Sequence, residues 1–88
     1  MLEDFRLKIF LTVVQEGGFT KAAAVLGVTQ PSVSQNIAEL EKKVGTKLFE
    51  RQRTEVVLTP AGILFKDYAE KILATYAKST QILARFPD

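Results

Sequence analysis

The chain has 88 residues, of which 47% are hydrophobic and 25% are charged. This length fits one domain with one core, and the composition is that of an ordinary globular chain, which excludes disorder and a fibrous repeat. Twelve Lys and Arg against ten Asp and Glu leave a net charge of only +2. Any argument for an anionic partner therefore depends on where the charges lie.

The sequence contains no Cys and no His. Their absence excludes disulfides, zinc sites built from thiolates or imidazoles, and catalytic triads that use histidine. Asp and Glu are scattered and there is no phosphate-binding glycine loop, so we expect neither an enzyme nor a cofactor or metal. Glu3 and Asp4 stand where a signal peptide would carry positive charge, and no apolar run is long enough to span a membrane. We therefore expect a cytoplasmic protein with no membrane partner.

The first predicted element is a helix over residues 2–16. Its apolar residues recur at three- and four-residue steps, which places them on one stripe of the helix. They are Leu2, Phe5, Ile9, Phe10, Val13 and Val14. Gly17 and Gly18 are expected to end this helix, because glycine relieves the steric cost of a left-handed C-terminal residue.

A short second helix is predicted over residues 21–26. Thr20 can cap it through its hydroxyl, and Phe19 can pack on Ala24 as a hydrophobic staple. The helix centre is a run of three alanines, which suits a helix pressed closely against a neighbour. Gly27 ends the helix, and a tight turn follows.

A third helix is predicted to begin at Gln30 or Pro31, because proline suits the first helical position, and to end at Gly45. Helical spacing places one set of residues within a narrow inward arc: Val33, Ile37, Leu40 and Val44. The opposite face carries Pro31, Gln35, Ala38 and Lys42.

Residues 48–49 and 56–58 are short β-prone runs separated by the polar stretch 51–55, which predicts a small β-hairpin. Thr59 and Pro60 then form an N-cap with proline at the first helical position. A helical pattern continues from there to about Phe86. Such a helix is roughly 40 Å long, more than a domain of this size can cover with its own core.

Taken in order, these elements make a winged helix-turn-helix. The predicted fold class is mainly α, with three helices, a small β-hairpin wing and a long C-terminal helix. We divide the chain into a winged helix-turn-helix domain at residues 1–59 and a long helix at residues 60–88.

Several motifs carry a resemblance to a known family. They are residues 19–23 (FTKAA), 29–34 (TQPSVS), 40–41 (LE), Gly45, 48–51 (LFER) and 58–62 (LTPAG). In order and spacing they resemble the LysR-type transcriptional regulators over the whole chain. The resemblance implies a bacterial DNA-binding domain followed by a dimerising linker helix.

This chain departs from the family pattern at two positions and in length. Gln35 stands where family members commonly carry a basic residue, and Thr54 stands where the second wing arginine often lies, with Arg53 beside it. Family members normally continue into a larger effector-binding domain. We therefore expect the chain to be a piece of a longer protein, and a small-molecule effector only if that domain exists.

The first turns of the third helix carry the residues expected to meet DNA. Helix N-terminal amides and short hydroxyls suit phosphate oxygens, while Gln35 is the best candidate for reading a base, because glutamine can pair bidentately with adenine. The alternative is that Ser32 and Ser34 serve only helix capping and solvation. Glu39, farther along, indicates that only the N-terminal half of the helix enters the groove. The resemblance points to the same set: Gln30, Pro31, Ser32, Ser34 and Gln35.

Positive charge gathers at the end of the third helix and in the wing, at Lys42, Lys43, Lys47, Arg51 and Arg53 against Glu50 alone. Within the wing, the two arginines can reach phosphate or an adjacent minor groove. Thr20 and Lys21 are further candidate phosphate contacts. A run of charge can equally be a solvated face.

The long helix carries an apolar stripe. Its early turns are expected to pack on their own domain and its distal half on the same helix of a second chain, which gives a symmetric homodimer. The residues assigned to dimerisation are Phe65, Tyr68, Ile72, Tyr76, Leu83 and Phe86. Two-fold symmetry would set two recognition helices against an inverted-repeat site in double-stranded DNA, with any higher assembly left to a full-length protein.

Two hypotheses follow. The first is the DNA-binding and dimerisation region of a sequence-specific transcriptional regulator. The second is a protein-interaction module on a winged scaffold with negligible DNA affinity, which the modest net charge leaves open. Under the second hypothesis, Arg51→Ala and Gln35→Ala leave function intact while Tyr76→Asp abolishes it.

Overall fold

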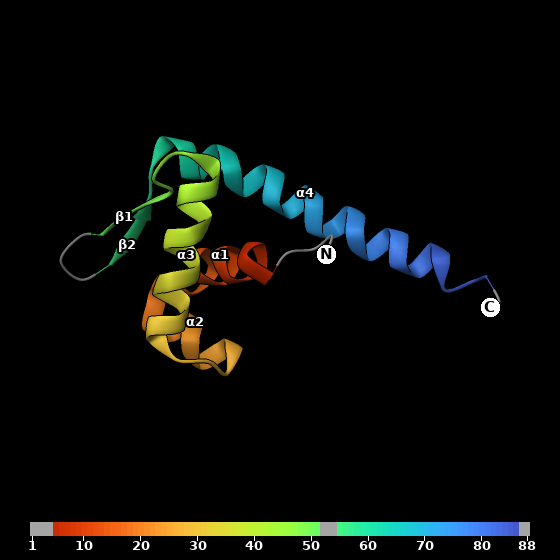
Figure 1. Cartoon of the computed structure of the whole chain (residues 1–88), viewed down its shortest axis with the longest axis horizontal. Coiled ribbons are helices and arrows are strands. Elements are labelled where there is room, and N and C mark those ends of the chain that lie inside the picture. The colour runs from red at the N-terminus through yellow and green to blue at the C-terminus, as the bar shows by residue number, and fades with distance from the viewer. Residues whose placement is uncertain (1–4, 52–54, 87–88) are drawn as a thin grey trace.

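The computed structural model describes residues 5–51 and 55–86 (Figure 1). Within them lie, in chain order, α1 (Phe5–Glu16), α2 (Phe19–Leu26), α3 (Gln30–Val44), β1 (Phe49–Arg51), β2 (Val56–Leu58) and α4 (Pro60–Leu83). The first three helices form a compact body, the hairpin projects from it, and α4 extends away on the other side (Figure 1). The predicted mainly α architecture is confirmed.

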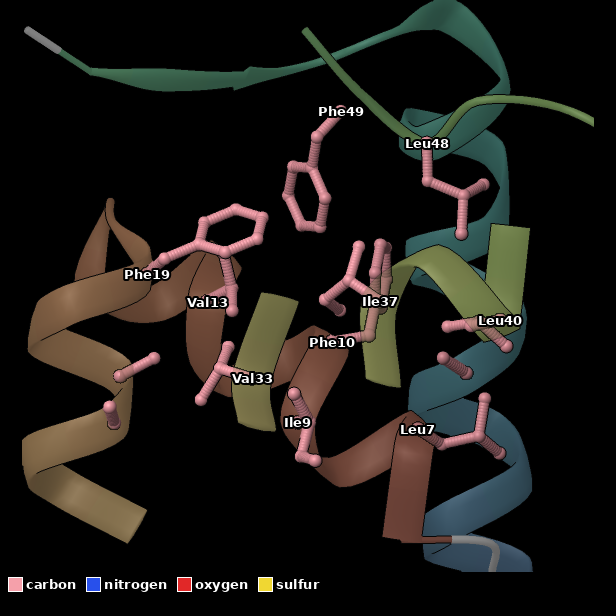
Figure 2. Packing of buried hydrophobic residues seen from close by; sticks show 13 residues of the cluster. Leu7, Ile9, Phe10, Val13, Phe19, Val33, Ile37, Leu40, Leu48 and Phe49 are labelled. Carbon is pink, nitrogen blue, oxygen red and sulfur yellow. The ribbon is translucent and has the colours of Figure 1, made fainter. Parts of the chain in front are cut away.

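Helices α1, α2 and α3 enclose a single apolar core that the hairpin and α4 close (Figure 2). The inward residues predicted for α3 are buried up to Leu40, but Val44 is 40% exposed, because the last turn of α3 passes the edge of the core. On α1, Leu7 is buried although the predicted stripe omitted it, whereas Phe5 is exposed. Leu2 lies outside the described residues.

Four aromatic rings connect the elements of the core. Phe10 of α1 lies 5.2 Å from Phe49 of β1 and 5.2 Å from Phe65 of α4, measured between ring centroids. Phe49 in turn lies 5.9 Å from Phe19 of α2 in an edge-on arrangement. Such tilted and edge-on pairs are the preferred aromatic geometries, so one chain of rings ties the wing and α4 to the body.

The start of α2 differs from the prediction. The helix begins at Phe19 with Gly18 as its N-cap and without a side-chain capping hydrogen bond. The predicted Thr20 cap and the staple between Phe19 and Ala24 are therefore wrong: Thr20 is an exposed residue within the helix, and Ala24 is exposed as well. Phe19 is only 7% exposed, and burial of its ring against Phe49 places it in the first turn of the helix.

The hairpin forms as predicted, with β1 and β2 antiparallel and Phe49 opposite Leu58. Its base is held by α3, because Glu41 Oε2 accepts hydrogen bonds from the backbone nitrogens of Leu48 at 2.8 Å and Phe49 at 3.2 Å. The carboxylate thus satisfies two backbone donors at the point where the chain enters the wing.

Thr59 performs the capping role predicted for it. Its Oγ1 accepts a hydrogen bond from the backbone nitrogen of Gly62 at 2.9 Å, and its hydroxyl donates to the carbonyl oxygen of Lys47 at 2.7 Å. Pro60 occupies the first helical position. The same side chain therefore starts α4 and ties it to the segment before β1.

Helix α4 has 24 residues, which corresponds to about 36 Å. Ala69 is buried in the core, and Phe65 and Leu73 pack against it from the same face of the helix. The helix ends at Leu83, earlier than the predicted Phe86, and the sequence places Pro87 directly after Phe86. A residue that precedes proline disfavours the helical conformation, so Phe86 is not expected to be helical. Before it, the backbone nitrogens of Arg85 and Phe86 donate to the carbonyl oxygens of Ile82 and Leu83, which is the tighter pattern typical of a helix end.

Candidate nucleic-acid interface

The first turn of α3 is organised by Thr29. Its Oγ1 accepts a hydrogen bond from the backbone nitrogen of Ser32 at 3.2 Å, and Pro31 lies in the first turn. The hydroxyl that caps α3 therefore belongs to Thr29 and not to either serine. Pro31 and Gln35 are exposed, while Ser32 is half-buried. Backbone donors and short polar side chains thus share the solvent side of this helix end.

Two residues, one from α3 and one from the wing, converge on the hydroxyl of Ser34. Ser34 Oγ accepts a hydrogen bond from Gln30 Nε2 at 2.8 Å and another from Arg51 Nη2 at 3.2 Å. The Arg51 guanidinium carbon also lies 4.3 Å from the centroid of the Phe19 ring, within the range of a cation–π contact. The wing arginine therefore reaches back onto the recognition helix.

Gln35 and Glu39 lie one helical turn apart on α3. Gln35 Nε2 donates to Glu39 Oε2 at 3.5 Å, at the long limit of a hydrogen bond. The other carboxylate oxygen, Glu39 Oε1, accepts from Arg6 Nε at 3.2 Å and from Arg6 Nη2 at 2.6 Å. The hydrogen bonds from the Arg6 guanidinium are the main reason that the pKa of Glu39 is lowered.

Arg6 is a residue of this face that the sequence did not indicate. It stands 33 positions before Glu39, so no local spacing connects the two. Because its charge offsets that of Glu39, the carboxylate on α3 repels phosphate less than a solitary carboxylate would.

The remaining candidate residues are spread over the surface. Thr20 and Lys21 are exposed at the start of α2, and Lys42 is exposed in the last turn of α3. Lys42 stands twelve positions after Gln30, about 18 Å along the helix. Arg53 lies outside the described residues. The structure therefore brings together Gln30, Ser34 and Arg51 and leaves Lys42 at the far end of α3.

Among residues 5–51 and 55–86, no group of His, Cys, Asp and Glu is arranged to hold a metal ion. In the same part of the chain, no helix combines the length and the apolar character needed to cross a membrane.

This arrangement, in which α2 with its buried Ala22 and Ala23 packs with α3 and a hairpin follows, corresponds to a known family of sequences. Residues 5–63 match the model described as bacterial regulatory helix-turn-helix protein, lysR family. The chain belongs to the LysR family. This LysR-family membership confirms the resemblance found in the sequence, and the family consists of transcriptional regulators and not of enzymes.

Individual LysR-family relatives agree. The HTH-type transcriptional regulator BudR of Klebsiella aerogenes is 50% identical over 68 residues, which cover 77% of this chain and 48% of the relative. A probable RuBisCO transcriptional regulator of Thalassiosira pseudonana is 40% identical over 83 residues, 94% of this chain and 27% of the relative. The chain thus spans about a quarter to a half of the length of these relatives.

A solved structure matches the fold as well. The crystal structure titled BenM_DBD/catB site 1 DNA complex superposes with a TM-score of 0.86 at 39% identity, covering 91% of this chain and 86% of that one. The chain is therefore a LysR-type DNA-binding domain with its linker helix.

Proposed function

We propose that two copies of this LysR-family domain bind an inverted-repeat promoter site, with the N-terminal half of α3 in the major groove and α4 as the dimer contact. The convergence of Gln30 and Arg51 on Ser34, at the exposed end of α3, is the observation that carries the proposal. The similar solved domain described above is in complex with DNA, which supports DNA binding by this domain.

Base recognition is assigned to the side chains that leave α3 toward solvent. Gln35 is exposed, and its carbonyl oxygen and amide can pair with the edge of adenine. Gln30 and Ser34 are half-buried beside it and present polar atoms to the same groove. The Glu39–Arg6 pair lies one turn farther along and marks the inner limit of this contact.

Phosphate contacts are assigned to the surroundings of that helix end. Ser32 and the exposed Pro31 lie at the N-terminus of α3, where the helix dipole and the backbone amides favour an anion. Thr20, Lys21 and Lys42 flank it on α2 and on the far end of α3. We also assign a phosphate contact to Arg53, because of its place in the wing sequence.

The dimer contact is assigned to the exposed side of α4, both along the turns that pack on the core and beyond them. Tyr68 is 55% exposed and Leu83 is 66% exposed, and the helix carries a shallow apolar groove. The groove is lined by Tyr68, Lys71, Ile72, Thr75, Tyr76 and Ser79. An apolar surface on a projecting helix suits a self-complementary contact with a second copy. Ile72 and Tyr76 lie within this surface, and the exposed Leu83 and Phe86 extend it toward the end of the chain. Phe65, in contrast, packs against the core of its own domain.

The proposal is tested by titrating the 88-residue protein onto an A·T-rich inverted-repeat duplex and a scrambled duplex, followed by fluorescence anisotropy at low and at physiological salt. We expect salt-sensitive binding that prefers the inverted repeat, with two subunits per duplex. No binding at low salt by a folded, dimeric protein would contradict the proposal and favour a protein-interaction module.

Gln35→Ala tests base reading separately from general affinity. Because Gln35 faces a base edge in this proposal, we expect affinity for the preferred duplex to fall roughly 10-fold while affinity for random DNA stays within about 2-fold. Lys42→Ala is the matched control, since a phosphate contact weakens both duplexes alike. Equal losses on both duplexes for Gln35→Ala would show that Gln35 does not read a base.

A further inference from the structure

We propose that Arg51 is a positioning residue, which holds the Ser34 hydroxyl so that Ser34 offers a hydrogen-bond donor, and not an acceptor, to the base that faces it. This inference rests on the DNA binding proposed above and deepens it. It assigns a specificity role to an arginine whose place in the wing otherwise suggests only a phosphate contact.

The position of Arg51 is determined by two contacts made at once. The guanidinium covers the Phe19 ring at 4.3 Å, and its Nη2 donates to Ser34 Oγ at 3.2 Å. Phe19 is itself held in the core against Phe49, so the ring offers a rigid platform. A planar, forked cation stacks flat on a ring and donates sideways in a fixed direction, whereas a lysine ammonium is a compact point charge on a flexible stem and lacks this fixed geometry.

The hydrogen bonds that Ser34 accepts leave only the proton of its hydroxyl for a further partner. A serine oxygen has two lone pairs and one proton. Gln30 Nε2 and Arg51 Nη2 both donate to Ser34 Oγ and so occupy both lone pairs. The proton remains for a third partner, and the half-buried side chain stands on the solvent side of α3. Ser34 is therefore a donor toward DNA.

A donor at this place selects among base edges. In the major groove, purine N7, guanine O6 and thymine O4 accept hydrogen bonds, whereas the N4 amino group of cytosine only donates. If a cytosine faced Ser34, its amino group and the Ser34 hydroxyl would both be donors, and no hydrogen bond would form between them. If Arg51 were removed, a lone pair of Ser34 would become accessible and the hydroxyl could accept from that amino group.

The test uses the tightest duplex selected by the wild-type protein from a pool of inverted repeats with randomised half-sites. Symmetric substitutions then place cytosine at each half-site position in turn, and anisotropy gives the affinity of wild type, Arg51→Lys, Ser34→Ala and the double variant. We expect one half-site position at which cytosine lowers the affinity of the wild type about 10-fold but the affinity of each single variant only about 2-fold. Arg51→Lys should keep the salt dependence, because it keeps the charge.

Non-additivity identifies the action of Arg51 through Ser34. We expect Arg51→Lys to change nothing further in the Ser34→Ala background. The proposal is overturned if Arg51→Lys keeps the discrimination against cytosine, or if it lowers the discrimination equally in both backgrounds. Lys42→Ala is the control for lost charge: it should weaken every duplex alike and keep the discrimination. A variant that folds poorly would also bind every duplex more weakly and keep the discrimination against cytosine. A loss of discrimination therefore does not come from misfolding.

A second measurement needs no DNA. In the free protein, the Nη signals of a ¹⁵N-labelled Arg51 should report slower rotation of the guanidinium than those of exposed Arg85, and Ser34→Ala should remove the difference. If Arg51 rotates as fast as Arg85 while the protein still binds the selected duplex, this proposal alone fails. If the wild type binds no duplex at low salt, the proposed function fails and this proposal with it.

Discussion

Glu39 and Glu41 stand two positions apart on α3 and differ in role because different groups face them. Glu41 turns toward the wing, where its carboxylate accepts from two backbone nitrogens and its Oε1 lies 3.7 Å from Lys47 Nζ. Glu39 turns toward α1 and pairs with Arg6. At the scale of single residues, one carboxylate therefore shapes the base of the wing, and the other adjusts the charge beside the recognition surface.

Replacing Glu41 by alanine should destabilise the fold. The substitution leaves the backbone nitrogens of Leu48 and Phe49, both buried residues, without their acceptor. We expect a loss of about 1–3 kcal/mol in the free energy of unfolding, measured by urea titration. Glu50→Ala, at an exposed position of β1, serves as the control and should change stability by less than about 0.5 kcal/mol. Equal effects of the two variants would contradict the role of Glu41.

The Arg6–Glu39 pair should make stability depend on pH in acid. The pKa of Glu39 is held below its ordinary value of 4.5, mainly by the Arg6 hydrogen bonds. A lowered folded pKa means that the pair contributes fully above about pH 4.5 and that the contribution is lost as the pH falls through the folded pKa. We expect the stability difference between wild type and Glu39→Gln to be constant from neutral pH to that point and then to shrink. Thermal unfolding over this range measures it, and a constant difference would show that the pair has no such effect.

The wing and α4 approach each other closely at their junction. Gly62 stands in the first turn of α4, buried against the segment that enters β1. A Cβ at this position would overlap the carbonyl oxygen of Leu48 and lie 2.8 Å from Leu58 Cδ2. At the scale of elements, the absence of a side chain is what allows α4 to start directly beneath the hairpin, with Thr59 bonded to both sides.

Gly62→Ala should therefore destabilise the domain, although alanine favours helices. The Leu48 carbonyl belongs to the backbone and cannot swing aside, so we expect a loss of about 1–3 kcal/mol from the strain of overpacking. The reverse exchange in the exposed part of the same helix, Ala74→Gly, should also cost about 1 kcal/mol, from propensity alone. Chemical denaturation measures both, and a stabilising Gly62→Ala would refute the close contact.

Helix α4 has two parts with different surroundings. Up to Leu73 it packs on the core of its own domain, and beyond Leu73 it extends away from the body (Figure 1). The described part of the molecule accordingly measures 52 × 27 × 19 Å. At the scale of the whole molecule, this extension places the last turns of α4 away from the hairpin (Figure 1).

Tyr76→Asp should separate the proposed dimer into monomers that remain folded. Tyr76 lines the apolar groove of α4 beyond the core, so a charge there opposes association and leaves the core intact. Sedimentation velocity should show half the mass, and affinity for the inverted repeat should fall toward that of a single half-site. Ala74→Asp lies on the opposite side of the helix and is the control. A dimeric Tyr76→Asp would place the contact elsewhere.

Much of the fold follows from local patterns. The sequence predicted the C-terminal ends of α1 and α3, the Thr59-Pro60 start of α4 and the hairpin. These features were predictable because capping residues, proline, glycine and apolar periodicity act over a few neighbouring positions. The order of these elements, with the motifs along the chain, also indicated the family. The predicted start of α2 was wrong, because the burial of Phe19 in the core outweighed the local capping preference of Thr20.

The candidate interface divides in the same way. The polar residues that face outward from α3 could be predicted from the sequence, because helical spacing sets the direction of each side chain. The contacts of Arg51 with Phe19 and Ser34, and the pair of Arg6 with Glu39, were not predictable from the sequence and appear only in the folded chain. These partners stand far apart along the chain, and no periodic pattern joins them. They meet because packing of the apolar core brings α1, α2 and the wing against α3.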